Sequence, residues 1–238
     1  MDLSIVIPVF NEVECIRPLL DEIGVCLVAE TGYEIIVVDD GSIDGTAAVL
    51  QAARQSHPGL RILRHRERYG QSAAIASGIK AASTQWIATL DGDGQNDPAD
   101  ILKLYRAMDE SPDDVQMVAG YRKQRMDGFL KRLTSRIANS VRAAVLHDDS
   151  PDSACGLRIF ARATFLSLPQ FDHMHRFLPA LVQRQGGKVL SVEVNHRKRQ
   201  RGLSKYGISN RLWVGIIDLL GVRWLQQRCK QPVVSEIE

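Results

Sequence analysis

Two aspartates separated by one glycine form the segment of this chain that is best suited to chemistry. Asp91 and Asp93 lie in the run 89–95, TLDGDGQ, directly after the short apolar segment 86–88. That segment predicts a buried strand, and open α/β sheets bind ligands beyond the carboxyl ends of their strands. Alternate residues of an extended chain point the same way, so the two carboxylates can share one divalent cation. The pattern therefore predicts Mg²⁺ or Mn²⁺ bridging to a nucleotide diphosphate, and an ordinary acidic turn is the alternative.

These carboxylates need a scaffold, and the hydrophobic pattern predicts one in which strands alternate with helices. The apolar run 3–10 has the length and continuity of a parallel strand that is buried on both faces. Further strands are expected at 33–39, 60–63, 84–90, 115–120, 156–160 and 189–194, and helices at 14–29, 44–54, 71–82, 98–108, 131–146, 176–185 and 208–229. This alternation predicts an α/β fold with a doubly wound, mostly parallel, Rossmann-like sheet and a C-terminal amphipathic helix. We expect a single domain over residues 1–229, followed by a disordered tail over 230–238.

Polar clusters follow three of the predicted strands. Asn11 and Glu12 come after the first strand, residues 39–42 after the second, and residues 91–93 after the fourth. Because these strand ends meet at one edge of a parallel sheet, they predict a composite nucleotide pocket rather than three separate turns. The chain contains no GxGxxG or GxxxxGK[ST] loop, which disfavours redox dinucleotides and P-loop phosphoryl transfer.

Charge divides the sequence into an acidic first half and a basic second half. Residues 1–120 hold 9 Lys/Arg and 19 Asp/Glu, whereas residues 121–238 hold 21 Lys/Arg and 9 Asp/Glu. The division suggests a metal-binding half and an anion-binding half, with solvated surface charge as the alternative. Nucleic-acid binding is a poor fit, because the half that carries the predicted pocket is acidic.

Cysteine spacing and hydropathy indicate the compartment. The four cysteines show no paired spacing, so they fit neither a zinc site nor a disulfide framework. Reduced thiols of a cytosolic protein are the expectation, and the N-terminus shows no secretory signal. The longest apolar tract, 212–225, is interrupted by Asp218 and Arg223 and is too short to span a bilayer unaided.

Six sequence motifs of this chain resemble those of a known enzyme family. Segments 5–12 (IVIPVFNE), 37–46 (VVDDGSIDGT) and 90–95 (LDGDGQ) are similar to family 2 glycosyltransferases, which have the GT-A fold. Segments 119–122 (AGYR), 152–158 (DSACGLR) and 196–206 (HRKRQRGLSKY) resemble the branch that includes dolichyl-phosphate mannose synthase and other polyprenyl-phosphate enzymes. The resemblance extends over about residues 1–225. Each motif alone is weak evidence for the family, but six motifs in this order are specific to it.

The resemblance implies an inverting, metal-dependent hexosyltransferase. It would move a sugar from a nucleotide-diphosphate sugar to a polyprenyl phosphate of the undecaprenyl or dolichyl type, in cell-envelope glycan biosynthesis. One alternative is a soluble family 2 enzyme that acts on a saccharide hydroxyl, with Asp152 as its base. Another is a non-catalytic subunit that recruits a membrane partner.

The resemblance also implies roles for individual residues. The nucleotide-sugar would be bound by Pro8, Asn11, Glu12, Asp39, Asp40, Asp91, Arg199 and Lys205. The metal, Mg²⁺ or Mn²⁺, would be held by Asp91, Asp93 and Gln95. Catalysis would involve Asp93, Asp152, Arg122 and Arg132, the two arginines facing the acceptor phosphate or the donor sugar. A basic loop at 195–207 would close over the donor. Tyr69 and Gln71 are candidates for lining the pocket, with helix capping and packing as the alternative.

The expected partners are a nucleotide-sugar, a polyprenyl phosphate, and a membrane surface or a membrane partner protein. Many bacterial members of the branch carry two C-terminal transmembrane helices, and this sequence shows no such span. The helix at 208–229 instead has an apolar face flanked by Trp213 and Trp224, which suits an interfacial anchor. We therefore expect a cytoplasmic protein that is peripheral on the inner face of the cytoplasmic membrane. Packing of this helix on the core, or on a second subunit of a homo-oligomer, is the alternative.

Overall fold

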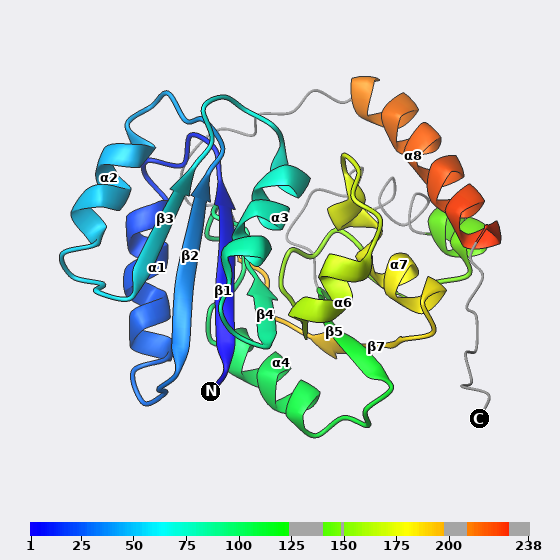
Figure 1. Ribbon diagram of the computed structural model, residues 1–238, viewed down its shortest axis with the longest axis horizontal. Helices are drawn as coiled ribbons and strands as arrows, with labels where there is room; N and C mark the ends of the chain where they lie inside the picture. Colours follow the sequence, from blue (N-terminus) through cyan, green and yellow to red (C-terminus); the bar gives the residue numbers. More distant parts are fainter. Residues whose placement is uncertain (124–139, 149, 198–208, 229–238) are drawn as a thin grey trace, which may run out of the picture.

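The computed structural model describes residues 1–123, 140–148, 150–197 and 209–228, with the backbone alone for 209–213. Within these ranges a seven-stranded sheet forms the centre of the molecule, in the order β3-β2-β1-β4-β6-β5-β7 (Figure 1). Its strands are β1 (Leu3–Val9), β2 (Tyr33–Asp39), β3 (Leu60–Arg64), β4 (Trp86–Thr89), β5 (Val115–Tyr121), β6 (Arg158–Ala161) and β7 (Lys188–Glu193). All neighbouring pairs are parallel except those of β6, which runs antiparallel to both β4 and β5. The expected mostly parallel α/β sheet is therefore present.

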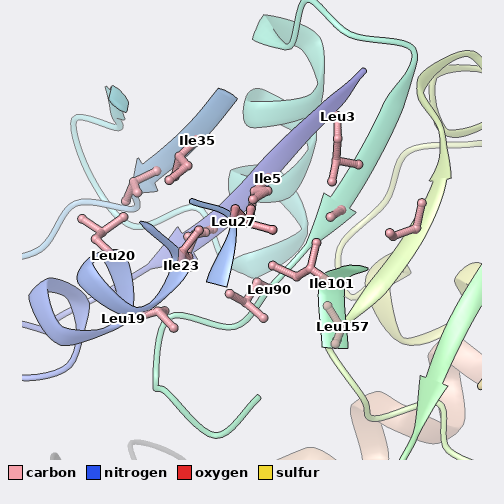
Figure 2. Close-up of a cluster of buried hydrophobic side chains, with 14 of the residues drawn as sticks. Leu3, Ile5, Leu19, Leu20, Ile23, Leu27, Ile35, Leu90, Ile101 and Leu157 are labelled. Carbon is pink, nitrogen blue, oxygen red and sulfur yellow. The ribbon is translucent and has the colours of Figure 1, made fainter. Parts of the chain in front are cut away.

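Helices cover both faces of the sheet because successive residues of the central strand alternate between them. Leu3, Ile5 and Ile7 of β1 face the first layer, and Val6 faces the second. The first layer consists of α1 (Ile16–Cys26), α2 (Thr46–Ala53) and α4 (Asp100–Asp109). Figure 2 shows side chains of α1 pointing towards β1 in this layer. Each fully buried Leu or Ile contributes about 1.5–3 kcal/mol to folding.

The second layer lies on the opposite face. It contains α3 (Gln71–Ala81), α6 (Arg162–Ser167), α7 (Leu178–Arg184) and the short 3₁₀ helix η1 (Met174–Arg176). The last helix, α8 (Ser209–Gln227), adds Val222 to this core. Figure 1 shows α8 beside α7, at the end of the molecule opposite α2. In the part of the chain that the structure describes, none of the helices has the length and apolar character needed to cross a membrane.

Several elements differ from the sequence expectations. The strand expected at 156–160 begins at Arg158, and α6 was not expected because six residues are too few to show helical periodicity. The helix expected at 176–185 is instead η1 followed by α7. The helix expected at 131–146 is described only over 140–146, which is helical. The loop at 198–207 and the tail at 230–238 lie outside the described residues.

Candidate active site

A pocket opens where β1 and β4 end, as the convergence of strand ends predicted. Its lining consists of Pro8, Val9, Phe10, Glu12, Asp40, Arg68, Gln71, Ala74, Asp91, Gly92 and Asp93. Five residues predicted for the site, Pro8, Glu12, Asp40, Asp91 and Asp93, are thus brought together. Asn11, Asp39 and Gln95 are close in sequence to lining residues but are not part of the lining.

The loops that follow β1 and β2 are joined by direct hydrogen bonds. The Asn11 backbone N–H donates to Ser42 Oγ at 2.8 Å, and the Ile43 N–H donates to Asn11 Oδ1 at 2.8 Å. Asn11 adopts a positive φ of 52°, a conformation that asparagine tolerates better than most residues. Next to it, the Glu12 N–H donates to Thr46 Oγ1 at 3.0 Å. The Asn11 side chain therefore fixes one wall of the pocket.

Asp39 is fully buried, and the described residues provide a hydrogen bond to only one of its carboxylate oxygens. Its Oδ1 accepts from the Ser42 N–H at 2.9 Å. Among the described residues no group donates a hydrogen bond to Oδ2, and Arg64 Nε lies 3.4 Å away. A buried carboxylate oxygen without a donor is costly, and the nearby Arg64 guanidinium offsets part of that cost.

Asp40 holds the loop that leads from β3 to α3. Its carboxylate accepts from the backbone N–H groups of Tyr69 at 2.9 Å and Gly70 at 2.8 Å, and its Oδ1 is 2.7 Å from His65 Nδ1. Gly41, with a φ of 74°, makes this contact feasible because a Cβ there would lie 2.6 Å from the Glu67 carbonyl carbon. Asp40 therefore places the loop 65–70 against the pocket.

This loop delivers a cation that the sequence reasoning missed. The Arg68 guanidinium lies 4.4 Å from the centre of the Phe10 ring, a cation–π distance, and both residues line the pocket. The sequence feature that could have indicated this arginine is the basic run RHRER at 64–68, between a predicted strand and a predicted helix. The rest of the charged lining is acidic, namely Glu12, Asp40, Asp91 and Asp93.

Asp91 and Asp93 form an acidic pair just after the end of β4. Burial raises the pKa of the Asp91 carboxyl to about 6, and the charge of Asp93 adds to that increase, while Arg158 and Arg122 oppose it. Gln71 Nε2 donates to Asp91 Oδ1 at 2.8 Å, so Gln71 reaches the site as expected. Asp93 Oδ1 accepts from the Gln95 backbone N–H at 3.1 Å.

These carboxylates fit a cation that also binds a ligand phosphate. Within the described ranges no cluster of three His, Cys, Asp or Glu side chains could hold a metal by itself. Mg²⁺ and Mn²⁺ are commonly held by one or two carboxylates together with substrate phosphates and water. The mutual repulsion that helps to raise the pKa of Asp91 would be relieved by such a cation.

Arg122 and Asp152 form a two-pronged ion pair close to Asp91. Arg122 Nε is 2.6 Å from Asp152 Oδ2, and Nη2 is 3.0 Å from Oδ1. Burial works to lower the pKa of Arg122, but the hydrogen bond and charge of Asp152 outweigh it and raise that pKa. Asp152 Oδ1 also accepts from the Ala154 N–H at 3.2 Å. Both carboxylate oxygens therefore already accept hydrogen bonds within the protein.

The remaining predicted site residues, Arg132, Arg199 and Lys205, lie outside the described residues. Two histidines, His173 and His175, contact other side chains of the protein. His175 is close to Ser72, with its Nδ1 2.7 Å from Ser72 Oγ, and burial holds the pKa of His175 well below its usual value. His173 Nδ1 is 3.0 Å from Asp218 Oδ2 in α8.

Comparison with known proteins relates this chain to sugar transferases. The family model described as "Glycosyl transferase family 2" matches residues 4–167. The chain is 34% identical to a dodecaprenyl-phosphate galacturonate synthase of Rhizobium johnstonii over 237 residues, 98% of this chain and 69% of that protein. It is 33% identical to an undecaprenyl-phosphate 4-deoxy-4-formamido-L-arabinose transferase of Edwardsiella ictaluri over 208 residues, 86% of this chain and 63% of that protein. The chain thus spans about two thirds of the length of these two relatives.

A solved structure shares the fold. Glucosyl-3-phosphoglycerate synthase from Mycobacterium tuberculosis, crystallised with Mn²⁺, uridine diphosphate and phosphoglyceric acid, superposes with a TM-score of 0.70 at 18% identity. The match covers 96% of this chain and 79% of that one. The mixed seven-stranded sheet is therefore of the GT-A type. Since the family model covers more than half of the sequence, the chain belongs to glycosyl transferase family 2.

Proposed function

We propose that this chain transfers a sugar, with inversion, from a nucleotide-diphosphate sugar to a polyprenyl phosphate. The names of the two relatives, one a dodecaprenyl-phosphate and the other an undecaprenyl-phosphate enzyme, support this acceptor class. The observation that carries the proposal is the Arg122–Asp152 pair. Asp152 is the one base that the sequence predicted, and Arg122 holds its carboxylate with two short contacts. A carboxylate stabilised in this way is a weak base, and a phosphate acceptor needs little help from a base near pH 7, since its second pKa is about 6.

The donor binds where the loops after β1, β2 and β3 meet. The family resemblance assigns Asp39 to the base, and Arg68 contributes positive charge to the pocket wall. Pro8, Asn11, Glu12 and Asp40 shape the surface for the base and ribose. Asn11 and Asp40 act through the loops that they hold in place.

Asp91 and Asp93 would hold Mg²⁺ or Mn²⁺, with Gln95 as the third predicted ligand. When bound, the cation supplies Lewis-acid stabilisation of the negative charge on the departing diphosphate. Arg199 and Lys205 bind the same diphosphate through charge-assisted hydrogen bonds. Together these groups stabilise the negative charge on the leaving group. This stabilisation is the main electrostatic requirement of the reaction.

Arg122 and Arg132 position the acceptor phosphate. A guanidinium has five N–H donors, and only two of those of Arg122 point to Asp152, so the others can bind a phosphate oxygen. The acceptor oxygen attacks the anomeric carbon on the face opposite the departing diphosphate, and this geometry inverts the configuration.

The C-terminal helix brings the enzyme to its lipid substrate. Ile217, Leu220 and Trp224 of α8 are exposed at 67%, 61% and 56% and follow one another at helical spacing. The Arg228 guanidinium lies 5.9 Å from the Trp224 ring. An apolar row edged by an aromatic ring and arginine suits the interface of a membrane, so we place the protein at the cytoplasmic membrane face. A contact with a second protein through the same row is the competing arrangement.

A transfer assay with two acceptor classes tests the proposal. A panel of nucleotide-sugars, each carrying a radiolabelled sugar, is incubated with the protein, Mn²⁺ and either undecaprenyl phosphate or soluble glycans. Label should pass to the lipid phosphate with at least one donor. Transfer to glycans alone would support the hydroxyl-acceptor alternative, and release of no nucleoside diphosphate with any donor would support a non-catalytic subunit.

A further inference from the structure

The Asp91 carboxylate has two close neighbours that carry no charge, Gln71 and Gly156. Gln71, the first residue of α3, donates from Nε2 to Asp91 Oδ1 at 2.8 Å. An ionised carboxylate can only accept hydrogen bonds, so the amide nitrogen of Gln71 must be the atom that faces it. Gln71 therefore determines which way one oxygen of Asp91 points.

The backbone of Gly156 packs against the same carboxylate. A Cβ added at residue 156 would lie within 2.5 Å of Asp91 Oδ1, a separation that real Cβ atoms do not reach. The Gly156 carbonyl accepts from Thr89 Oγ1 at 2.7 Å, which ties this segment to the end of β4. Only glycine leaves room for Asp91 in this position.

A buried arginine holds the segment that contains Gly156. Arg158 is 4% exposed, and its Nη2 donates to the Ser153 carbonyl at 2.6 Å while its Nη1 donates to the His175 carbonyl. These bonds attach the segment 153–158 to η1, the short helix before α7. The Gly156 backbone is thus a fixed surface rather than an adaptable one.

We propose that Gln71 and Gly156 are positioning residues that set the side-chain conformation of Asp91 for metal binding. The inference rests on the proposed role of Asp91 as a ligand of Mg²⁺ or Mn²⁺. A carboxylate beside a second carboxylate would otherwise turn away from it, because the two charges repel each other. Hydrogen bonding from Gln71 and contact with Gly156 oppose that movement and so reduce the reorganisation needed when a cation binds.

Direct metal binding by the full-length protein tests this role without relying on activity. Mn²⁺ is titrated calorimetrically in the presence of saturating UDP or GDP, whichever the wild-type protein binds. Gln71→Met removes the donor but keeps the side-chain length, and Gly156→Ala adds the Cβ. Gln51→Met, at an exposed position of α2, and Gly59→Ala, with no atom within 4 Å of the added Cβ, are the matched controls.

Loss of an outer partner of a metal ligand typically weakens metal binding about 10–100-fold. We expect this loss in Gln71→Met and in Gly156→Ala, with wild-type affinity in both controls. The thermal unfolding midpoint of Gln71→Met should match that of Gln51→Met, because the lost bond serves the ligand and not the core. Since Gly156→Ala can perturb folding, Gln71→Met decides the outcome.

A third variant separates positioning from direct ligation. Gln71→Glu replaces the donor by an acceptor, so it should weaken Mn²⁺ binding if Gln71 acts by donating to Asp91. Mn²⁺ binding by Gln71→Glu that equals or exceeds wild type would overturn the positioning role, as would unchanged binding by Gln71→Met. If the wild-type protein binds nucleotide but no Mn²⁺, the assignment of Asp91 as a metal ligand fails. If the wild-type protein binds Mn²⁺ and Gln71→Met binds it equally well, only the positioning role of Gln71 fails.

Discussion

Arg122 and Asp152 are 30 residues apart in the chain and form a two-pronged ion pair, with Nε 2.6 Å from Oδ2 and Nη2 3.0 Å from Oδ1. Asp152 is 5% exposed, so this pair neutralises a charge that would otherwise be costly to bury. We propose that Asp152 holds Arg122 in place and does not take a proton from an acceptor.

The first prediction follows from that assignment. Asp152→Asn keeps the shape of the side chain but removes its charge, so Arg122 loses its ionic partner and the acceptor KM should rise. The rate of transfer to lipid phosphate above pH 7 should keep the pH dependence of the wild type. Initial rates between pH 6 and pH 9 measure this. A general base would reveal itself by a loss of about 10²–10⁴-fold in kcat together with a changed pH profile.

The second prediction concerns the cation of the pocket wall. Arg68→Ala should weaken binding of the donor nucleotide by roughly 1.5–3 kcal/mol, the usual range for a hydrogen bond to a charged group. Arg66→Ala removes an exposed arginine from the same loop and is the control. Calorimetric titration with nucleoside diphosphates measures both. Equal affinities for the two variants would exclude Arg68 from the donor site.

The strand ends and their carboxylates could be predicted from the sequence because both depend on local pattern. Continuous apolar runs mark buried parallel strands, and polar clusters mark the points where β1, β2 and β4 end. The antiparallel direction of β6 could not be predicted, since hydrophobic periodicity carries no information on strand direction. The family motifs supplied the predicted roles of the residues, and the fold shows which of these residues are near one another.

Other parts of the site depend on contacts between distant segments. Arg68 reaches the pocket because Asp40, 28 positions earlier, binds the backbone of the loop at 69 and 70. Gln71 is 20 positions from Asp91, and no spacing rule connects an amide at the start of a helix with a carboxylate after a strand. The contact of Gly156 with Asp91 likewise exists only in three dimensions.

The third prediction is a pH dependence of folding. Burial acts to raise the pKa of Glu34, but hydrogen bonds from Ser4, Ser83 and Arg61 outweigh it and lower that pKa to about 2, from 4.5 in the unfolded chain. Because the pKa is lower in the folded state, the stabilisation is complete above about pH 4.5 and is lost as the pH falls towards 2. Glu34→Gln should reduce the free energy of unfolding at pH 7 by roughly 1–3 kcal/mol.

Urea unfolding at several pH values checks this prediction. The difference in the free energy of unfolding between wild type and Glu34→Gln should shrink as the pH is lowered below 4.5. Glu110→Gln, an exposed change after the end of α4, is the control and should show no such trend. A difference between wild type and Glu34→Gln that does not vary with pH would mean that the charge of Glu34 adds nothing to stability.

The fourth prediction concerns the exposed row of α8. The double variant Ile217→Asp, Leu220→Asp should abolish co-sedimentation with anionic liposomes, whereas Val25→Asp, at an exposed apolar position of α1, should not. Wild-type binding should weaken at high salt, because each basic residue near an anionic surface contributes about 1 kcal/mol. Wild-type protein that stays in the supernatant and forms a dimer disrupted by the double variant would show that the row binds protein.

Identification of the reaction product tests the central claim most directly. The wild-type protein is incubated with undecaprenyl phosphate, Mn²⁺ and the nucleotide-sugar selected by the transfer assay, and the lipid fraction is analysed by mass spectrometry and phosphorus NMR. We predict a glycosyl phosphodiester of undecaprenol with inverted anomeric configuration and one nucleoside diphosphate released per product. Product should be absent after chelation of the metal and in the variant Asp93→Asn. Undecaprenyl phosphate recovered unchanged, with no glycosyl phosphodiester in the lipid fraction, would contradict the account.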